Sequence, residues 1–318
     1  MKQSKKAIVF GAGGFIGGHL VSFLTSKGYW VRAVSSKELK ETTASEIYTG
    51  DCKQLQFVEQ CFQGESFDEV YQCAAEMGGI THVSNGIHDA DIMSNSALIN
   101  INVLKACVKY GNPRILFTSS ACVYTKDDNG DCRCLEEDAY PANPELGYSW
   151  EKIFSEKLYE SYAKQYGLQI RIARLHSIIG EESRWKDGRE KAHSALSYKV
   201  VKVEPDGEIE VIGDGTQMRT FLHIDDCIEG IYTLMQSDVT EPINIGSDEL
   251  RSINELLDML REVSGKQFTV KYISGPIGYR IRHCPIEKAK KLIGWVPKIT
   301  LKEATKRTYA WINSQISK

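Results

Sequence analysis

Tyr148 and Lys152 are the residues whose spacing most directly indicates chemistry. They stand four positions apart, so a helix would place both side chains on one face. A free phenol has a pKa of ~10 and is a poor base at neutral pH, whereas a nearby ammonium stabilises the phenolate and lowers that pKa. Such a tyrosine could remove a proton from an alcohol while a hydride leaves for a redox cofactor. The Y-x-x-x-K spacing alone is nearly uninformative, so its meaning depends on the surrounding residues.

The segment Thr118-Ser119-Ser120-Ala121-Cys122 follows an apolar run and adds hydroxyls and a thiol. Ligands of open parallel sheets bind at the carboxyl ends of the strands, where this segment would lie. We therefore expect the Ser120 hydroxyl to bind the substrate oxygen, with a plain turn at a strand end as the alternative. Cys122 is either a reactive thiol or a small buried hydrophobic residue, which is the commonest fate of a free cysteine.

A glycine-rich segment follows the first apolar run, Lys6–Phe10, and opens a helical pattern, Phe15–Ser26. Its glycines allow a tight turn and a close approach of the backbone to a pyrophosphate, while the helix N-terminus offers free N–H groups. The context between a strand and a helix is the one a dinucleotide loop requires. The residues expected to bind the dinucleotide here are Gly11, Gly14, Phe15, Ile16 and Gly17.

The end of the second expected strand, Trp30–Val34, bears on the type of cofactor. A carboxylate usually stands there and binds the adenosine ribose, but this chain has Ser35, Ser36 and Lys37 instead. We expect NAD as the cofactor, with Ser35 at the ribose position and Asp51 at the adenine end. NADP is the alternative, because Ser35, Lys37 and the nearby Arg32 could accept a 2′-phosphate.

The elements that must position these residues alternate between strands and helices, which predicts an α/β fold with a Rossmann-type, doubly wound parallel sheet and a smaller C-terminal α/β substrate domain. The expected strands are Lys6–Phe10, Trp30–Val34, Glu46–Thr49, Glu69–Gln72, Arg114–Thr118 and Gln169–Ala173. The expected helices are Phe15–Ser26, Gln54–Cys61, Ser96–Lys109 and a long one from about Gly147 to Gln165. Ser252 and Glu255 form a capping-box pattern for a helix over Ile253–Val263.

The pattern divides the chain into two expected domains. Residues 1–175 form the dinucleotide-binding domain, with a return segment at about 216–246, and residues 176–215 and 247–318 form the substrate domain. The 318 residues carry a net charge of −3 with no long run of one sign, so nothing points to nucleic acid as a partner. No segment approaches the ~20 apolar residues of a membrane span.

The nine cysteines indicate where the protein works. An odd number of cysteines, with no secretory signal at the start, favours reduced thiols and a cytoplasmic location. Cys132 and Cys134 form an isolated C-x-C pattern without a second pair or nearby histidines, which disfavours a metal site. We expect no bound metal.

The glycine-rich loop, Ser120, Tyr148 and Lys152 together resemble the nucleotide-sugar enzymes of the extended short-chain dehydrogenase/reductases, the NAD-dependent epimerase/dehydratase family. A narrower set of segments resembles the GDP-mannose 3,5-epimerases. These segments are Ala74–Gly79, Ser119–Tyr124, Arg189–Ala192, Gly213–Phe221 and Asn244–Glu249.

This resemblance implies an isomerase that inverts C5, and C3, of GDP-mannose through a transient 4-keto sugar, with bound NAD(P) recycled. It further implies that Cys122 and Lys191 act as an acid–base pair on opposite faces of the sugar ring. The sugar-nucleotide 4,6-dehydratases have Thr-Asp-Glu where this chain has Ser120-Ala121-Cys122. The missing carboxyl group disfavours elimination of water.

The resemblance also implies a substrate site in which Arg219 and Arg282 hold the nucleotide diphosphate, a task that suits the planar guanidinium. Arg280 could substitute for Arg282. Ser177 stands where the family has asparagine, so one amide contact is replaced. The residues implied to bind substrate are Gly78, Ser120, Cys122, Ser177, Glu190, Lys191, Ala192, Lys199, Gln217, Arg219 and Arg282.

Two other interpretations remain open at this level. Another enzyme on the same scaffold, such as a nucleotide-sugar 4-epimerase or a reductase, would use the same tyrosine and lysine. A non-catalytic dinucleotide-binding regulatory protein would need neither of them. The resemblance also implies a homodimer, formed through the helices on the side of Ala97 and Tyr159.

Overall fold

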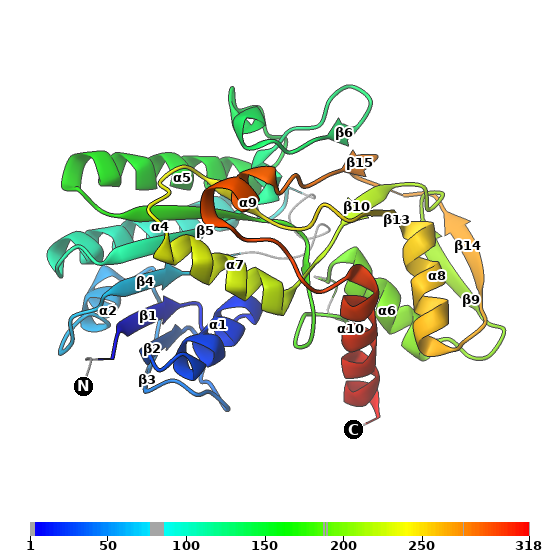
Figure 1. Ribbon diagram of the computed structural model, residues 1–318, viewed down its shortest axis with the longest axis horizontal. Coiled ribbons are helices and arrows are strands. Elements are labelled where there is room, and N and C mark those ends of the chain that lie inside the picture. The colour runs from blue at the N-terminus through cyan, green and yellow to red at the C-terminus, as the bar shows by residue number, and fades with distance from the viewer. Residues whose placement is uncertain (1–3, 77–85, 187, 189, 276, 318) are drawn as a thin grey trace.

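The computed structural model describes residues 4–76, 86–186, 188, 190–275 and 277–317 (Figure 1). A seven-stranded parallel sheet forms its centre, in the order β12-β7-β5-β4-β1-β2-β3. Its strands are β1 (Lys6–Phe10), β2 (Trp30–Ser35), β3 (Glu46–Thr49), β4 (Glu69–Gln72), β5 (Arg114–Ser120), β7 (Ile170–Leu175) and β12 (Ile243–Ile245). The expected Rossmann-type α/β fold is confirmed.

Continuous apolar runs in the sequence become strands that are buried on both faces, as parallel sheets require. In β1, Ala7 and Val9 join one core cluster, and Ile8 and Phe10 join the cluster on the other face. This alternation follows from the two-residue period of a strand. Each face therefore needs its own layer of helices.

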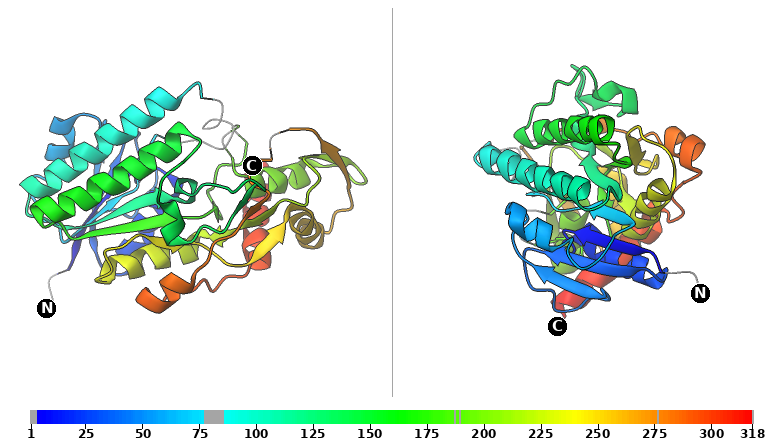
Figure 2. Two further views of the ribbon diagram at one scale, coloured as in Figure 1. Left: turned by 90° about the horizontal axis from the view of Figure 1, so that it is seen from above. Right: turned by 90° about the vertical axis from the view of Figure 1, so that its left-hand side faces the viewer.

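Helices cover both faces of the sheet. The first core cluster contains residues of α1 (Phe15–Ser26) and α7 (Ile224–Gln236), and the second contains residues of α4 (Asp89–Lys109) and α5 (Gly147–Tyr166) together with α2 (Leu55–Gln60). Figure 2 shows α4 and α5 on one side of the sheet and α7 on the other. The sheet with its two helix layers forms a three-layer sandwich.

Two helix boundaries are informative. Helix α4 begins at Asp89, seven residues before the expected start, because Asp89 and Asp91 favour the positive N-terminal end and Ile92 is buried. Helix α5 ends where Gly167 adopts a left-handed conformation with φ of 73°. The boundaries of α5 agree with the expected long helix to within one residue.

The C-terminal part of the chain forms a second core beside the sheet (Figure 1). It comprises the helices α6 (Ala192–Lys202), α8 (Ile253–Ser264) and α10 (Leu301–Ile316) with the parallel pair β9 (Glu208–Ile212) and β14 (Thr269–Ile273). The expected capping box is confirmed, because Ser252 and Glu255 exchange side-chain and backbone hydrogen bonds at the start of α8. None of the helices in the described ranges is long and apolar enough to cross a bilayer.

A small four-stranded sheet joins distant parts of the chain in the order β13-β10-β15-β6. Its strands are β13 (Leu250–Ser252), β10 (Met218–Thr220), β15 (Ile281–Arg282) and β6 (Asp131–Cys132). Two further short strands, β8 (Ile178–Ile179) and β11 (Leu222–His223), pair in parallel, and α9 (Glu287–Ile293) precedes the last helix. Strand β10 carries Arg219 and β15 carries Arg282, so this sheet brings both arginines together.

A buried ion pair links helix α5 to the sheet. Arg174 of β7 donates from Nε and Nη2 to the two carboxylate oxygens of Glu156 on α5, at 3.0 and 2.7 Å. Both side chains are almost completely buried, and the Ser119 hydroxyl also donates to Glu156. Removing one partner of such a pair leaves an uncompensated buried charge.

Replacing Glu156 with alanine should therefore lower the free energy of unfolding by about 3–5 kcal/mol, measured by denaturant titration. Glu160→Ala is the matched control on the same helix, because Glu160 forms an exposed ion pair with Lys157. Loss of this exposed pair should lower the free energy of unfolding by less than about 1 kcal/mol. Equal losses in the two variants would contradict a structural role for the buried pair.

Candidate active site

The glycine-rich loop lies between β1 and α1, at the carboxyl edge of the sheet where the strand order reverses. Gly11 has a φ of +80°, and a Cβ there would lie 2.7 Å from the backbone nitrogen of Ala74. A Cβ on Gly17 would lie 2.2 Å from the carbonyl oxygen of Gly11. Side chains are therefore excluded at both positions, as a loop that lets the backbone approach a pyrophosphate requires.

Helix α1 begins directly after this loop at Phe15. Within the described part of the chain, its N-cap Gly14 makes no side-chain capping bond and its first turn carries no acidic residue. The first N–H groups of α1 are thus free for a phosphate oxygen, and the positive end of the helix dipole favours one. Phe15 and Ile16 lie partly buried against the core. This loop fits the dinucleotide that the sequence predicts.

The adenosine end of the expected site centres on Ser35. This residue ends β2 and lies against the loop, because a Cβ on Gly13 would come within 2.5 Å of its Oγ. The Ser35 Oγ accepts a hydrogen bond from the Lys37 backbone N–H at 3.1 Å. Asp51 follows β3 and is exposed, with its carboxylate accepting from the Lys53 N–H at 2.9 Å.

Arg32 is wrong as a ligand for a 2′-phosphate. Its side chain is buried, pairs with Glu46 and donates to the carbonyl oxygens of Cys61 and Gln63. The rings of Trp30, Tyr48 and Phe67 surround its guanidinium. Arg32 faces the core because it lies on the side of β2 that α2 covers. Only Ser35, Ser36 and Lys37 remain of the set that would favour NADP.

Tyr148 and Lys152 lie one turn apart in the first two turns of α5, and both are buried. The Lys152 ammonium donates to the Thr118 carbonyl oxygen at 3.4 Å and lies 5.6 Å from the centre of the Tyr148 ring. Burial raises the pKa of the Tyr148 phenol above its usual value, while Lys152 and a hydrogen bond with Ser120 oppose that rise. The pair therefore has the expected geometry, although its net phenol pKa is raised rather than lowered.

Glu151 is a buried acid that the sequence analysis missed. Its Oε2 lies 3.6 Å from the Lys152 Nζ, and its Oε1 accepts from Ser155 at 2.6 Å and Asn100 at 3.2 Å. Burial lowers the pKa of Lys152, but Glu151 and Tyr148 outweigh it and raise that pKa overall. Glu151 therefore keeps Lys152 charged inside the protein. The i, i+4 spacing of Tyr148 and Lys152 does not indicate Glu151, because residues next to each other in a helix normally point in different directions.

Ser120 and Cys122 lie at the carboxyl end of β5. The Ser120 Oγ accepts from the Cys122 backbone N–H at 3.1 Å and so caps the short helix Ala121–Val123. Cys122 is partly exposed and packs near Ile92, Tyr148 and Leu146. The thiol and the phenol are thus in one site.

The charge on Arg282 is the main reason that Cys122 is acidic. Burial raises the pKa of the Cys122 thiol, but Arg282, a hydrogen bond with Ser120 and Lys191 together hold it below its usual value. The sequence analysis assigned Arg282 to a diphosphate alone and missed this contact. A strand pairing between residues so far apart in the sequence leaves no local signal.

Arg282 and Arg219 form a cationic pair beside the thiol. The Arg282 Nε and Nη2 are buried and have no hydrogen-bond partner among the described residues, and its guanidinium lies 4.6 Å from the centre of the Tyr279 ring. Burial and Arg282 lower the pKa of Arg219 to about 10. Within the described ranges no carboxylate forms an ion pair with either arginine, so the pair fits an anion.

The Arg219 guanidinium also holds backbone segments of the site together by hydrogen bonds. It donates to the carbonyl oxygens of Met218, Ile277 and Tyr279. Arg280 is wrong as a substitute for Arg282, because its guanidinium pairs with Asp131 and donates to the carbonyl oxygen of Asn129. It therefore points away from Cys122.

Lys191 is the N-cap residue of α6 and is exposed to solvent. Although the side chain as a whole is exposed, the protein packed around its ammonium removes water from that group and lowers its pKa, and Arg282 adds to that effect, while Cys122 and Cys227 oppose it. Since Cys122 and Lys191 influence each other, the structure brings the expected acid–base pair together. Ala192 follows as the exposed first residue of α6, and the Glu190 Oε2 is buried without a partner in the described part of the chain.

The remaining expected substrate residues differ in their positions. Ser177 follows β7 with a strained φ of 37°, next to His176, whose pKa burial and Arg282 lower to about 3. Lys199 and Gln217 instead donate to carbonyl oxygens of β9, those of Glu210 and Ile212. Gly78 lies outside the described residues.

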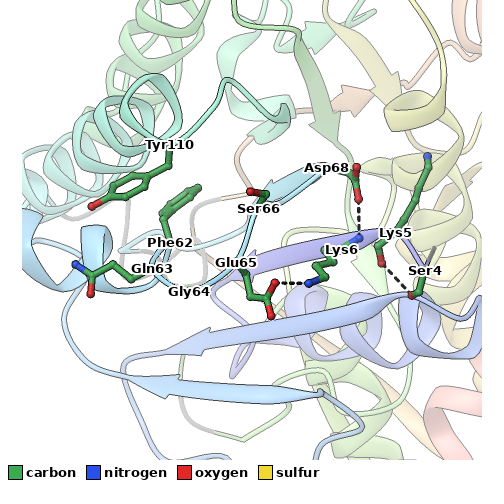
Figure 3. A pocket seen from close by; sticks show the side chains of 10 residues that line it. All are labelled: Ser4, Lys5, Lys6, Phe62, Gln63, Gly64, Glu65, Ser66, Asp68 and Tyr110. Atoms are coloured by element: carbon green, nitrogen blue, oxygen red, sulfur yellow. Dashed lines mark hydrogen bonds and ion pairs between the residues drawn. The ribbon is translucent and has the colours of Figure 1, made fainter.

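An open hollow of about 740 Å³ lies at the opposite, amino edge of the sheet (Figure 3). Its charged groups are already satisfied, because Lys6 pairs with Glu65 and its backbone N–H donates to Asp68. None of the residues predicted to bind the dinucleotide or the substrate is among those that line it. The described residues also contain no cluster of three or more His, Cys, Asp or Glu that could hold a metal.

Comparison with known proteins agrees with this fold. Residues 7–246 match the NAD dependent epimerase/dehydratase family. The chain is 36% identical over 324 residues to the GDP-mannose 3,5-epimerase of Arabidopsis thaliana, and the match covers 99% of this chain and 84% of that protein.

Two solved structures share the fold. The UDP-glucose 4-epimerase of Thermotoga maritima with UDP-glucose is 23% identical, with a TM-score of 0.87 over 98% of this chain and 99% of that one. The UDP-glucose 4-epimerase of Thermus thermophilus in complex with NAD is 22% identical, with a TM-score of 0.83 over 96% and 98%. At such identities the likeness establishes the fold alone.

The contact between Arg282 and Cys122 leads to a test that needs no substrate. In Arg282→Gln, the pH at which iodoacetamide alkylates Cys122 half-maximally should rise by about 1–3 units, because the main stabilising cation is gone. Peptide mass spectrometry after a timed reaction identifies the alkylated residue. Arg280→Gln is the matched control and should leave the midpoint unchanged. A midpoint that stays constant in Arg282→Gln would disprove the stabilising role.

Proposed function

The chain belongs to the NAD dependent epimerase/dehydratase family, and on that basis we propose that it is a GDP-mannose epimerase that inverts C5, and C3, through a transient 4-keto sugar. The observation that supports this most is the packing of Cys122 against Tyr148 at the end of β5, with Arg282 beside the thiol and Lys191, at the start of α6, close enough to affect it. A 3,5-epimerase needs a base that takes the hydroxyl proton while the cofactor would take the hydride, and two groups that exchange protons with the neighbouring carbons. The identity to the plant GDP-mannose 3,5-epimerase supports the choice of sugar.

The residues proposed to hold NAD are Gly11, Gly14, Phe15, Ile16, Gly17, Ser35, Asp51, Tyr148 and Lys152. When bound, the nicotinamide accepts a hydride from the sugar C4 and later returns it, so no net oxidation occurs. NAD is favoured over NADP because Arg32 is held in the core and cannot meet a 2′-phosphate. Lys37 is the remaining cation on that side.

Tyr148 is the proposed base for the C4 hydroxyl. Its phenolate takes the hydroxyl proton, and the Lys152 ammonium stabilises that phenolate in a site with little water. The Ser120 hydroxyl donates a hydrogen bond to the same sugar oxygen. Burial opposes the phenolate and raises the pKa of Tyr148. The positive charge of Lys152 is therefore needed to stabilise the phenolate.

Cys122 and Lys191 are proposed to invert the carbons beside the ketone. A ketone acidifies its neighbouring C–H bonds, so one group can remove a proton from one face while another delivers a proton to the opposite face. We assign the base to the Cys122 thiolate, because Arg282 favours its charged form. Lys191, with its lowered pKa, delivers the proton more readily than an unperturbed lysine.

Arg219 and Arg282 are proposed to hold the diphosphate, with Ser177, Glu190, Ala192, Lys199 and Gln217 in the wider substrate site. Two buried nitrogens of Arg282, which have no hydrogen-bond partner in the part of the chain that the structure describes, support its part in this. Lys199 and Gln217 would have to leave their bonds with β9 to reach a substrate.

We also propose a homodimer formed through the outer face of α4 and α5. Large apolar side chains are exposed there, namely Met93, Leu98, Trp150 and Phe154. Ala97 lies among them, but Tyr159 is wrong for this surface because it is buried and stacks on Phe117 at 4.5 Å. The free state of all nine cysteines supports a cytoplasmic location.

Incubation with GDP-mannose in deuterated water, followed by NMR of the sugar, tests the proposed reaction. We expect deuterium at C5, and at C3, without added cofactor, because both positions exchange beside the ketone. Cys122→Ser and Lys191→Ala should each slow exchange by about 10²–10⁴-fold, and Cys107→Ser, a buried thiol remote from the site, should not. Inversion at C4 without deuterium would indicate a 4-epimerase, and stoichiometric loss of reduced cofactor a reductase.

The buried Glu151 makes a prediction about pH. A carboxylate next to Tyr148 raises its phenol pKa, so Glu151→Gln should lower that pKa. The rise of turnover with pH should then occur about one unit lower, because the phenolate is present at lower pH. The pH profile of turnover measures this, with Glu160→Gln as an exposed control on the same helix. A profile that moves to higher pH would contradict this direct effect and show that Glu151 acts on Tyr148 mainly by keeping Lys152 charged.

A further inference from the structure

The proposed reaction makes no use of Cys132 and Cys134, which lie very close together. Their Sγ atoms are 3.0 Å apart. Side chains two positions apart on a strand share a face, and Cys134, with a left-handed φ of 52° just past the end of β6, bends the chain so that the sulfurs meet. The Asn244 side chain holds the Cys134 carbonyl oxygen at 2.8 Å and so fixes this bend.

The two thiols differ in acidity. The hydrogen bond from Cys134 lowers the pKa of Cys132, and Arg282, which pairs with Cys132 across the strands, lowers it further against the effect of burial. The same contact raises the pKa of Cys134. One thiol is thus prepared to be the attacking thiolate, and the other is held within reach of it.

Another pair of cysteines provides a contrast within the same chain. Cys52 also acts on Cys61, but burial raises the pKa of each to about 12. Neither has a neighbouring thiol that stabilises its thiolate by a hydrogen bond. Proximity of two cysteines alone therefore does not produce the arrangement found at Cys132 and Cys134.

We propose that Cys132 and Cys134 form a redox-active dithiol that a small peroxide closes to a disulfide. The Cys132 thiolate attacks one peroxide oxygen, the O–O bond breaks, and a sulfenic acid and hydroxide form. The Cys134 sulfur then attacks the sulfenic sulfur, loses its proton and expels the second hydroxide. Two thiols and one hydrogen peroxide thus give one disulfide and two waters.

Both thiols are buried, at 5% and 0% exposure, so a small oxidant is the class that fits. Closing the bond moves the sulfurs from 3.0 Å to about 2.05 Å, a shift the loop can absorb. Reversible dithiols of this kind are compatible with a reducing compartment. The two thiols take no part in the proposed sugar chemistry, although Arg282 influences both sites.

Arg133 lies between the two cysteines, which makes the test direct, because trypsin separates them. Folded protein is treated with hydrogen peroxide, remaining thiols are alkylated, and the protein is unfolded and digested without reductant. The expected product is peptide 127–133 joined to peptide 134–152, released by dithiothreitol. Cys122 lies on another peptide, so its own oxidation is recorded separately.

Cys134→Ser should abolish the linked product while circular dichroism shows the same fold. Cys52 and Cys61 should stay unlinked in every sample. The proposal is overturned if no linked pair forms while Cys122 becomes oxidised, or if Cys132 joins Cys122 or Cys284 instead. Failure of the GDP-mannose assay would leave this outcome unaffected.

Discussion

The need to neutralise one buried guanidinium organises the site. Arg282 carries buried nitrogens without a partner among the described residues, and an uncompensated buried charge costs several kcal/mol. Of the groups that can carry a negative charge, Cys122 acts most strongly on Arg282, ahead of Tyr279 and Cys134, and so the arginine makes a cysteine acidic. Burial, assisted by the same cation, lowers the pKa of His176 to about 3. A diphosphate bound there would compete with the thiolate for the same positive charge.

The scaffold brings these groups together at one edge of a parallel sheet. The ends of β1, β4 and β5 lie side by side there, so the glycine loop, Ala74 and Ser120 converge although they are far apart in sequence. Helix α5 is anchored twice, through Glu156 to Arg174 and through Glu151 to Asn100. Tyr148 and Lys152 therefore sit on a helix whose rotation and height are fixed by buried polar contacts.

The sequence predicted whatever depends on local pattern. The glycine loop, the spacing of Tyr148 and Lys152, and the capping box at Ser252 each follow from neighbouring residues. Contacts between residues far apart in the sequence could not be predicted. Arg32 was a candidate ligand for a 2′-phosphate but faces the core, and Tyr159 was placed on the expected dimer surface but stacks on Phe117. Arg282 reached its place beside Cys122 through pairing with strands from distant segments. Charge partners across such pairings have no periodic signature.

The last strand of the central sheet has a consequence for synthesis. Strand β12 pairs with β7, yet about seventy residues of other structure separate them in the chain. When only the first 175 residues of a nascent chain have left the ribosome, the edge of β7 has no partner strand. One apolar face of the sheet also lacks α7 at that stage. Unpaired edges template aggregation. Nascent chains should therefore depend on chaperones until residue 245 emerges.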